Sequence, residues 1–89
     1  MDITTDDVVV SLAGHDKGGV FAVIGLDREY AIIADGRQRK IEKPKKKKRK
    51  HLKAIGRLEL PSPIATNREL RQALRTYSEA RATAAEGGI

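Results

Sequence analysis

The chain has no cysteine, no tryptophan and only three aromatic residues among its 89. Without cysteine it can form neither a disulfide framework nor a thiolate metal site. Since Phe21, Tyr30 and Tyr77 are the only aromatic residues, the core must be built from Val, Ile, Leu and Ala. The same scarcity excludes a sheet that stacks several RNA bases on aromatic side chains.

Long hydrophobic runs and catalytic groupings are also missing. No apolar run approaches the roughly 20 residues needed to cross a bilayer, and residues 1–7 lack the basic and apolar regions of a signal peptide. The two histidines, His15 and His51, have no cysteine companions and no Ser and Asp at the spacing of a catalytic triad. We therefore predict a cytoplasmic protein that is not an enzyme and that uses no cofactor, no metal ion and no membrane anchor.

What the chain does have is a concentration of positive charge. The net charge is +6, but residues 37–53 alone contain eleven Lys or Arg and one acid, Glu42, which gives a local charge of +10. The rest of the chain carries a net charge of −4. Such an uneven distribution creates a directional field suited to a polyanion.

Short runs of β-branched residues bounded by Gly and Asp predict strands at residues 8–12, 20–25 and 29–34. Asp35-Gly36 is typical of a hairpin turn, so we expect a basic, mostly solvent-facing fourth strand at residues 37–42. Within residues 43–50 like charges repel one another and Pro44 removes a donor, which predicts an extended loop in the free protein. Residues 51–55 can close the sheet as a fifth strand, with Leu52 and Ile55 pointing inward.

A loop rich in glycine, residues 13–19, joins the first two predicted strands. Its glycines can adopt positive φ without a Cβ clash. Lys17 would then lie at an exposed tip, beside backbone N–H groups open to an anion. The alternative interpretation is that the loop binds no ligand. It would then only connect the two strands tightly, with Lys17 solvated.

These segments together resemble a KOW motif. A hydrophobic run, Gly14-x-x-Lys17-Gly18 and a second hydrophobic run from Val20 are followed by residues 30–36 and by a basic stretch that ends in Lys50-His51-Leu52. The resemblance covers residues 6–56 and is to KOW-domain ribosomal proteins, including small bacterial relatives. It implies an SH3-like barrel that binds RNA, with contacts from Ser11, His15, Asp16 and Lys17 at the strand end and loop.

The expected fold is therefore mainly β. We predict a small SH3-like five-stranded barrel at residues 1–56, which carries a basic arm at 37–53, then a linker at 57–65 and one amphipathic C-terminal helix at 66–89. Five short strands favour this barrel, although periodicity alone leaves other small β folds open.

The predicted helix has three features. Thr66 and Glu69 fit a capping box at its start. Leu70, Ala73, Leu74 and Tyr77 recur at helical spacing and form a thin apolar stripe, which can dock on the barrel or on a partner. Arg68, Arg71 and Arg75 share another face, which is either a solvated surface or a second strip for RNA.

The predicted function is RNA binding in association with the ribosome or ribosomal RNA. Lysine acts as a point charge, so the basic arm should hold phosphates rather than read bases. The candidate RNA-binding residues are Ser11, His15, Asp16, Lys17, Arg37, Arg39, Lys40, Lys43, Lys45, Lys46, Lys47, Lys48, Arg49, Lys50 and His51.

Other functions remain open from the sequence. A protein-interaction module of the transcription or translation machinery would use the barrel and the helix, with ribosomal or transcription proteins as partners. The lysines alone would also suit DNA, and residues 44–50 resemble a nuclear-import signal. With no partner at all, the basic run would be a solvated loop.

Overall fold

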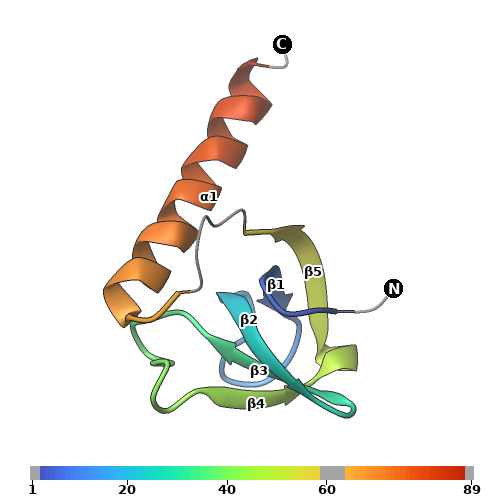
Figure 1. Ribbon diagram of the computed structural model, residues 1–89. Helices are drawn as coiled ribbons and strands as arrows, with labels where there is room; N and C mark the ends of the chain where they lie inside the picture. The colour runs from blue at the N-terminus through green and yellow to red at the C-terminus, as the bar shows by residue number, and fades with distance from the viewer. Residues whose placement is uncertain (1–2, 59–63, 88–89) are drawn as a thin grey trace.

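The computed structural model describes residues 3–58 and 64–87, with side chains through Ala80. Within these ranges the chain forms five strands and one long helix (Figure 1): β1 (Asp7–Ser11), β2 (Val20–Asp27), β3 (Tyr30–Ala34), β4 (Lys45–Lys48), β5 (Leu52–Arg57) and α1 (Asn67–Gly87). A 3-10 turn, η1 (Arg49–His51), joins β4 to β5. The predicted mainly β fold with a C-terminal helix is confirmed.

The strands make one antiparallel sheet in the order β4-β3-β2-β1-β5. β4 and β5 are its edges, and among the described residues no ladder of hydrogen bonds joins them. Irregularities between Val8 and Val9 and between Val23 and Gly25 interrupt the strand pairing, and bulges of this kind bend and twist a sheet. The sheet is therefore bent but open, and the predicted closure into a barrel is not formed.

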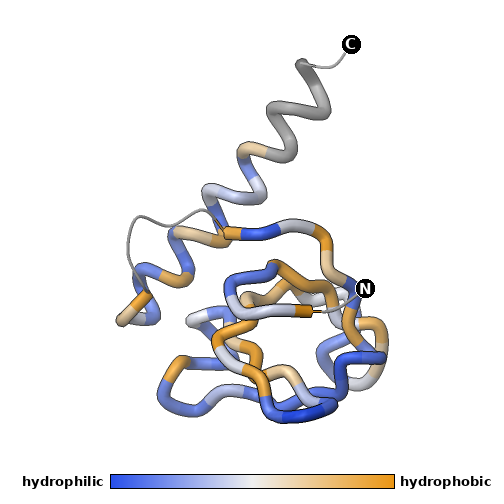
Figure 2. Tube along the Cα trace, turned by 45° about the vertical axis from the view of Figure 1, so that its right-hand side comes forward, coloured by the Kyte–Doolittle hydropathy of each residue, from blue (hydrophilic) through white to orange (hydrophobic). Residues whose placement is uncertain are grey.

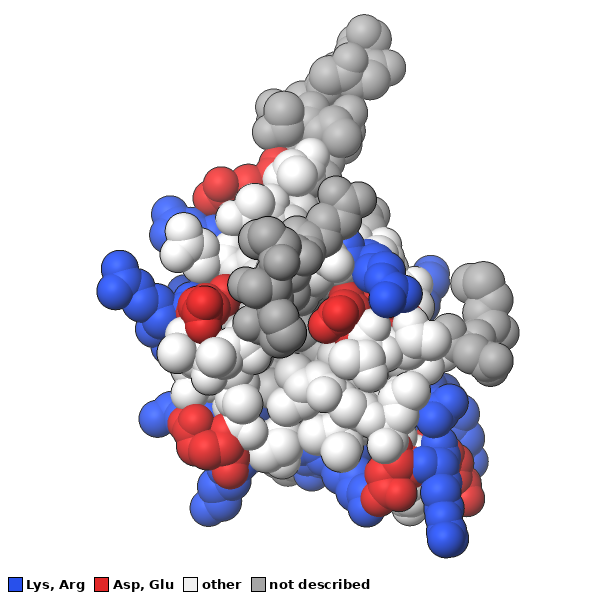
Figure 3. Space-filling view, viewed as in Figure 1, with Lys and Arg blue, Asp and Glu red and all other residues white. Residues whose placement is uncertain are grey.

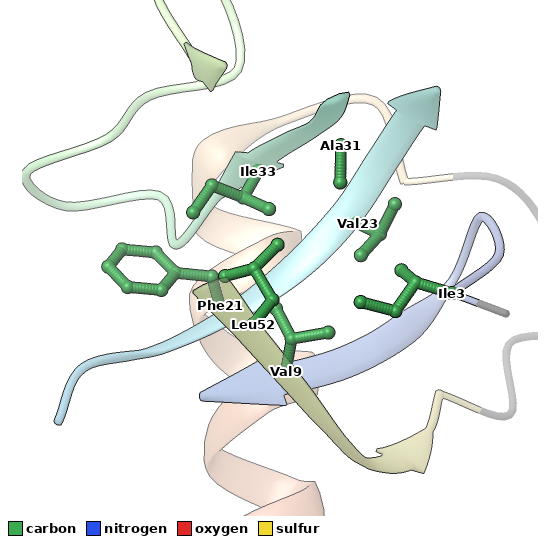
Figure 4. Close-up of a cluster of buried hydrophobic side chains, with 7 residues drawn as sticks. All are labelled: Ile3, Val9, Phe21, Val23, Ala31, Ile33 and Leu52. Atoms are coloured by element: carbon green, nitrogen blue, oxygen red, sulfur yellow. The ribbon is translucent and has the colours of Figure 1, made fainter. Parts of the chain in front are cut away.

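One face of the sheet carries the first hydrophobic cluster. Side chains alternate across a strand, so every second residue of β1, β2 and β3 points to this side. Figure 4 shows its members turned toward one another: Ile3, Val9, Phe21, Val23, Ala31, Ile33 and Leu52. Leu52 points inward as predicted, whereas Ile3 comes from a polar segment that shows no strand pattern.

The opposite face of the sheet is covered by α1. Val8, Ala22 and Ala34 alternate with members of the first cluster and pack with Leu70 and Leu74 of the helix. In Figure 2 apolar and hydrophilic positions alternate along the first half of α1, as expected for a helix with one buried side. The apolar stripe of the helix thus docks on the sheet of the same chain, and the C-terminal half of α1 extends past the sheet (Figure 1).

α1 begins with the predicted capping box. The Glu69 N–H donates to Thr66 Oγ1 at 3.1 Å, and the Thr66 N–H donates to Glu69 Oε1 at 3.0 Å. The Thr66 hydroxyl and the Ala65 N–H donate to the same carboxylate, and these hydrogen bonds lower the pKa of Glu69. Over residues 3–58 and 64–87, no helix combines the length and the hydrophobicity needed to cross a lipid bilayer.

The predicted fourth strand at residues 37–42 is wrong. Residues 35–44 form a loop, and β4 lies instead in the lysine run for which we expected an extended loop. The cause is Asp35, whose Oδ1 accepts hydrogen bonds from the N–H groups of Arg37 and Arg39, both at 2.9 Å. A short polar side chain that binds these donors removes them from a strand ladder. The other predicted strands are confirmed, with ends shifted by one or two residues.

Candidate nucleic-acid interface

The lysines of β4 form an ordered ridge at the edge of the sheet. Lys45 and Lys47 lie opposite Ile33 and Ala31 of β3, while Lys46 and Lys48 lie opposite Ile32 and Tyr30. Because paired residues share a face, the four lysines alternate between the two sides of the edge. Their alkyl stems can cover apolar neighbours while the ammonium groups stay in water. The basic run is therefore a fixed, two-sided ridge and not the loose arm that we predicted.

Two of these lysines have defined partners. Lys46 Nζ lies 2.6 Å from Asp27 Oδ2 and 5.4 Å from the centre of the Tyr30 ring. The hydrogen bond and the charge of Asp27 raise the pKa of Lys46. Lys47 Nζ donates to the Ala13 carbonyl oxygen at 2.6 Å, which ties β4 to the loop between β1 and β2.

The loop between β1 and β2, residues 12–19, satisfies much of its own backbone. The predicted positive φ values occur at Gly14 (+78°) and Gly18 (+86°). The N–H groups of residues 17, 18 and 19 donate to carbonyl oxygens of residues 14, 11 and 16. These amides are therefore not open to an anion, contrary to the prediction.

The side chains that the KOW resemblance assigns to this loop fall into two groups. Ser11 is buried, and its Oγ donates to the Ala13 carbonyl oxygen at 3.1 Å, so it supports the loop from within. Asp16 is also occupied, since its carboxylate is only 7% exposed and accepts two hydrogen bonds from Arg39 Nη2 at 3.0 and 3.2 Å. His15 and Lys17 are exposed at the tip, where a ligand can reach them.

The ion pair between Asp16 and Arg39 joins the 12–19 loop to the 35–44 loop. Asp35 fixes the backbone of Arg39 on the second loop, so the guanidinium has a defined position. Arg39 Nε is buried and has no hydrogen-bond partner among the described residues. Asp16 and Arg39 thus hold the 12–19 loop beside the basic 35–44 loop, and Lys47 ties the 12–19 loop to β4.

The remaining candidates lie on the 35–44 loop and on η1. Exposed cations there are Arg37, Lys40, Lys43 and Lys50. Arg49 is half-buried, and its Nε has no hydrogen-bond partner in the part of the chain that the structure describes. The carbonyl oxygen of His51 accepts the N–H of Leu12 at 2.9 Å, which anchors η1 beside the 12–19 loop.

Lys and Arg side chains gather on the rim of the molecule. Figure 3 shows them along the left and lower edges of the view, where α1 begins, the 35–44 loop passes and β4 lies. Of the eleven Lys and Arg in residues 37–53, only Arg39 and Lys46 form ion pairs with described residues. We call the cations of β4, η1 and the 12–19 and 35–44 loops the basic rim.

A second basic feature lies between the 35–44 loop and α1. It is a groove of about 480 Å³ lined by Arg37, Arg68, Arg71, Gln72, Arg75, Thr76 and Glu79. The helical spacing of three of these arginines is visible in the sequence. The position of Arg37 beside them follows only from the path of the folded loop, as do the contacts of Lys46 with Asp27 and Tyr30.

The chemistry that these surfaces offer is oxyanion binding. Ammonium and guanidinium groups bind phosphate and carboxylate oxygens by charge and hydrogen bonding. No three His, Asp or Glu side chains of the described residues lie close enough together to hold a metal ion. No protein-family model matches the chain, and no curated protein matches its sequence.

Proposed function

We propose that this protein binds structured RNA, ribosomal RNA in the first place, through the basic rim. The observation that carries the proposal is the array of cations in residues 37–53, of which only Arg39 and Lys46 are paired with acids among the described residues. Cations held close together repel one another. A phosphate backbone relieves that repulsion and gains free energy by releasing condensed counterions.

The two-sided ridge of β4 favours RNA over DNA. Lysines on both sides of one strand edge can contact two facing rows of phosphates at the same time. The deep and narrow major groove of A-form RNA brings such rows together, whereas the major groove of B-form DNA is about 12 Å wide. The strand is already ordered in the free protein, so binding costs little conformational entropy. In this mechanism the rim recognises groove shape and phosphates and does not read bases.

A protein-interaction module would use the apolar stripe of α1, and in this structure that stripe is already covered. Leu70 is fully buried and Leu74 is 9% exposed, both against the sheet of this chain. The helical stripe is therefore occupied in the free protein.

The test compares the wild type with a variant of the rim, K45Q/K48Q/K50Q, on an A-form RNA hairpin and a DNA duplex of equal length. Dissociation constants are measured over a range of NaCl concentrations. Each lost phosphate contact should reduce the slope of log affinity against log salt by roughly 0.7–0.9. We expect a reduced slope and weaker binding for the variant, and tighter binding of the wild type to RNA than to DNA.

Arg57 supplies the control. It is an exposed cation on β5, outside residues 37–53. R57Q should leave the salt slope unchanged. An unchanged slope in K45Q/K48Q/K50Q, or a wild type that does not bind RNA at low salt, would refute the proposal.

A further inference from the structure

We infer that the arginine groove on α1 is a second phosphate-binding site, on which the RNA backbone continues after it leaves the basic rim. This inference rests on the proposed RNA binding and extends it to the helix. The ligand is a run of phosphodiester groups, held by Arg37, Arg68, Arg71 and Arg75.

The groove is a fixed feature because the 35–44 loop is bound to the start of α1. Arg71 Nη1 donates to the Gly36 carbonyl oxygen at 2.8 Å, and the Ile41 N–H donates to Asn67 Oδ1 at 2.8 Å. Gly36 permits this contact, since a Cβ at this position would lie 2.5 Å from the Asn67 carbonyl oxygen. The close contact places Arg37 beside the helical arginines.

The helical arginines face away from the sheet. Leu70 and Leu74 occupy the buried side of α1, and residues at 68 and 75 lie on the opposite side at 3.6 residues per turn. The Arg75 side chain is 79% exposed and that of Glu79 is 67% exposed, so the ion pair between them at 3.1 Å is accessible to water. An exposed pair of this kind is worth little, so a phosphate can replace Glu79 at small cost.

The length of the groove suits several phosphates of one nucleic-acid strand better than a single anion. Arg68 and Arg75 are seven residues apart, which is about 10 Å along a helix that rises 1.5 Å per residue. Four guanidinium groups, each with five N–H donors, offer more donors than the oxygens of one phosphate can accept. Successive phosphates of one strand can use them, and each guanidinium can bind its phosphate through two parallel hydrogen bonds.

The groove is also continuous with the basic rim. Arg37 lines the groove and is the first cation of the basic segment 37–53. Figure 3 shows basic side chains along the same edge of the molecule, from the start of α1 down to β4, with acidic side chains between some of them. A polyanion that follows the 35–44 loop therefore passes from the lysines of β4 to the arginines of α1.

The test is R68Q/R75Q in the full chain, with R57Q as the control. Arg68 and Arg75 are exposed and contribute nothing to the hydrophobic clusters, so the thermal unfolding curve should not change. For a ribosomal RNA hairpin the salt slope should fall by roughly 1.4–1.8 for two lost contacts, with at least a tenfold loss of affinity at low salt. R57Q should match the wild type in both measurements.

The outcomes separate this inference from the proposed function. If R68Q/R75Q binds RNA as the wild type does while K45Q/K48Q/K50Q is impaired, the groove is not an RNA site and the rim remains one. If the wild type does not bind RNA, both proposals fail. If polyglutamate displaces the RNA from K45Q/K48Q/K50Q, in which the rim is weakened, as well as inorganic polyphosphate of equal charge does, the groove recognises carboxylates and the assignment to phosphates is wrong.

Discussion

At the scale of single residues, Gly36 is the point where the sheet, the 35–44 loop and α1 meet. Its φ is +80°, and besides the Asn67 carbonyl oxygen an added Cβ would meet Arg71 Cγ at 2.9 Å. Both the backbone conformation and the space exclude a side chain here. The arginine groove therefore depends on a residue that has no side chain.

G36A should lower the free energy of unfolding by roughly 2–4 kcal/mol, because strain in the left-handed region adds to overpacking against the helix. The matched control is G18A. Gly18 has a similar φ of +86° but nothing within 4 Å of an added Cβ, so only the backbone strain of about 1 kcal/mol remains. Urea denaturation of both variants measures the difference, and equal losses would show that the contact with α1 is not tight.

Asp35 shows what a sequence pattern leaves out. The Asp35-Gly36 pair suggests a two-residue turn, and the residues after it suggest a polar strand. The direction of the Asp35 side chain decides between a turn and a longer loop, and it is set by the two amides that the carboxylate binds. Local propensity takes no account of this competition for the two N–H groups. The charge of the 35–44 loop was therefore predictable from the sequence, whereas its conformation was not.

At the scale of elements, the capping box makes the start of α1 sensitive to acid. Hydrogen bonds from Thr66 and Ala65 lower the pKa of Glu69 in the folded state. A carboxyl group with a lowered folded pKa stabilises the fold above its unfolded pKa of about 4.3 and loses that contribution as the pH falls through the folded value.

E69Q retains hydrogen-bonding atoms at this position but has no charge. The wild type should be more stable than E69Q at pH 7, and the difference should shrink as the pH falls below about 4. Thermal unfolding at a series of pH values measures this difference. A difference that stays constant with pH would show that the charge of Glu69 does not contribute.

The packing of α1 on the sheet allows a second test at this scale. L70A removes a fully buried side chain from the second cluster and should cost about 2–5 kcal/mol. The matched control L26A changes a leucine that is 40% exposed and should cost at most about 0.5 kcal/mol. Chemical denaturation compares the two, and a small loss for L70A would mean that the helix is only loosely docked.

The elements differ in how far sequence predicts them. β1, β2 and β3 are runs of Val, Ile and Ala, and α1 has a complete capping box, so local signals define them. β4 consists of four lysines, and its strand conformation comes from pairing with the apolar residues of β3. A local sequence pattern cannot predict such long-range pairing. The charge of the site was therefore predictable, whereas its two-sided arrangement was not.

At the scale of the whole molecule, the fold concentrates like charges. Ten of the eleven Lys and Arg in residues 37–53 lie on β4, η1 and the 35–44 loop, and the eleventh, Lys53, lies on β5 at the other edge of the sheet. Self-repulsion of this kind destabilises a folded state and is screened by salt. The free protein should therefore be stabilised by ions that reduce the repulsion.

The melting temperature should rise by several degrees between low and high NaCl concentration, since a change of about 1 kcal/mol moves it by about 4–8 °C in a domain of this size. K45Q/K48Q/K50Q removes three of the repelling charges and should show a smaller rise. Differential scanning calorimetry at a series of NaCl concentrations provides the measurement. A melting temperature that is independent of salt would argue against repulsion within the rim.

The position of β4 at the border of the sheet has a consequence for the unbound protein. A border strand presents backbone donors and acceptors to which a strand of another molecule can add. Four adjacent ammonium groups discourage that addition, because two copies would bring identical charges together. The lysines that we assign to RNA thus also protect the sheet against edge-to-edge pairing with another molecule. Neutralising them should promote self-association, so every neutral variant needs a light-scattering check before its affinity is interpreted.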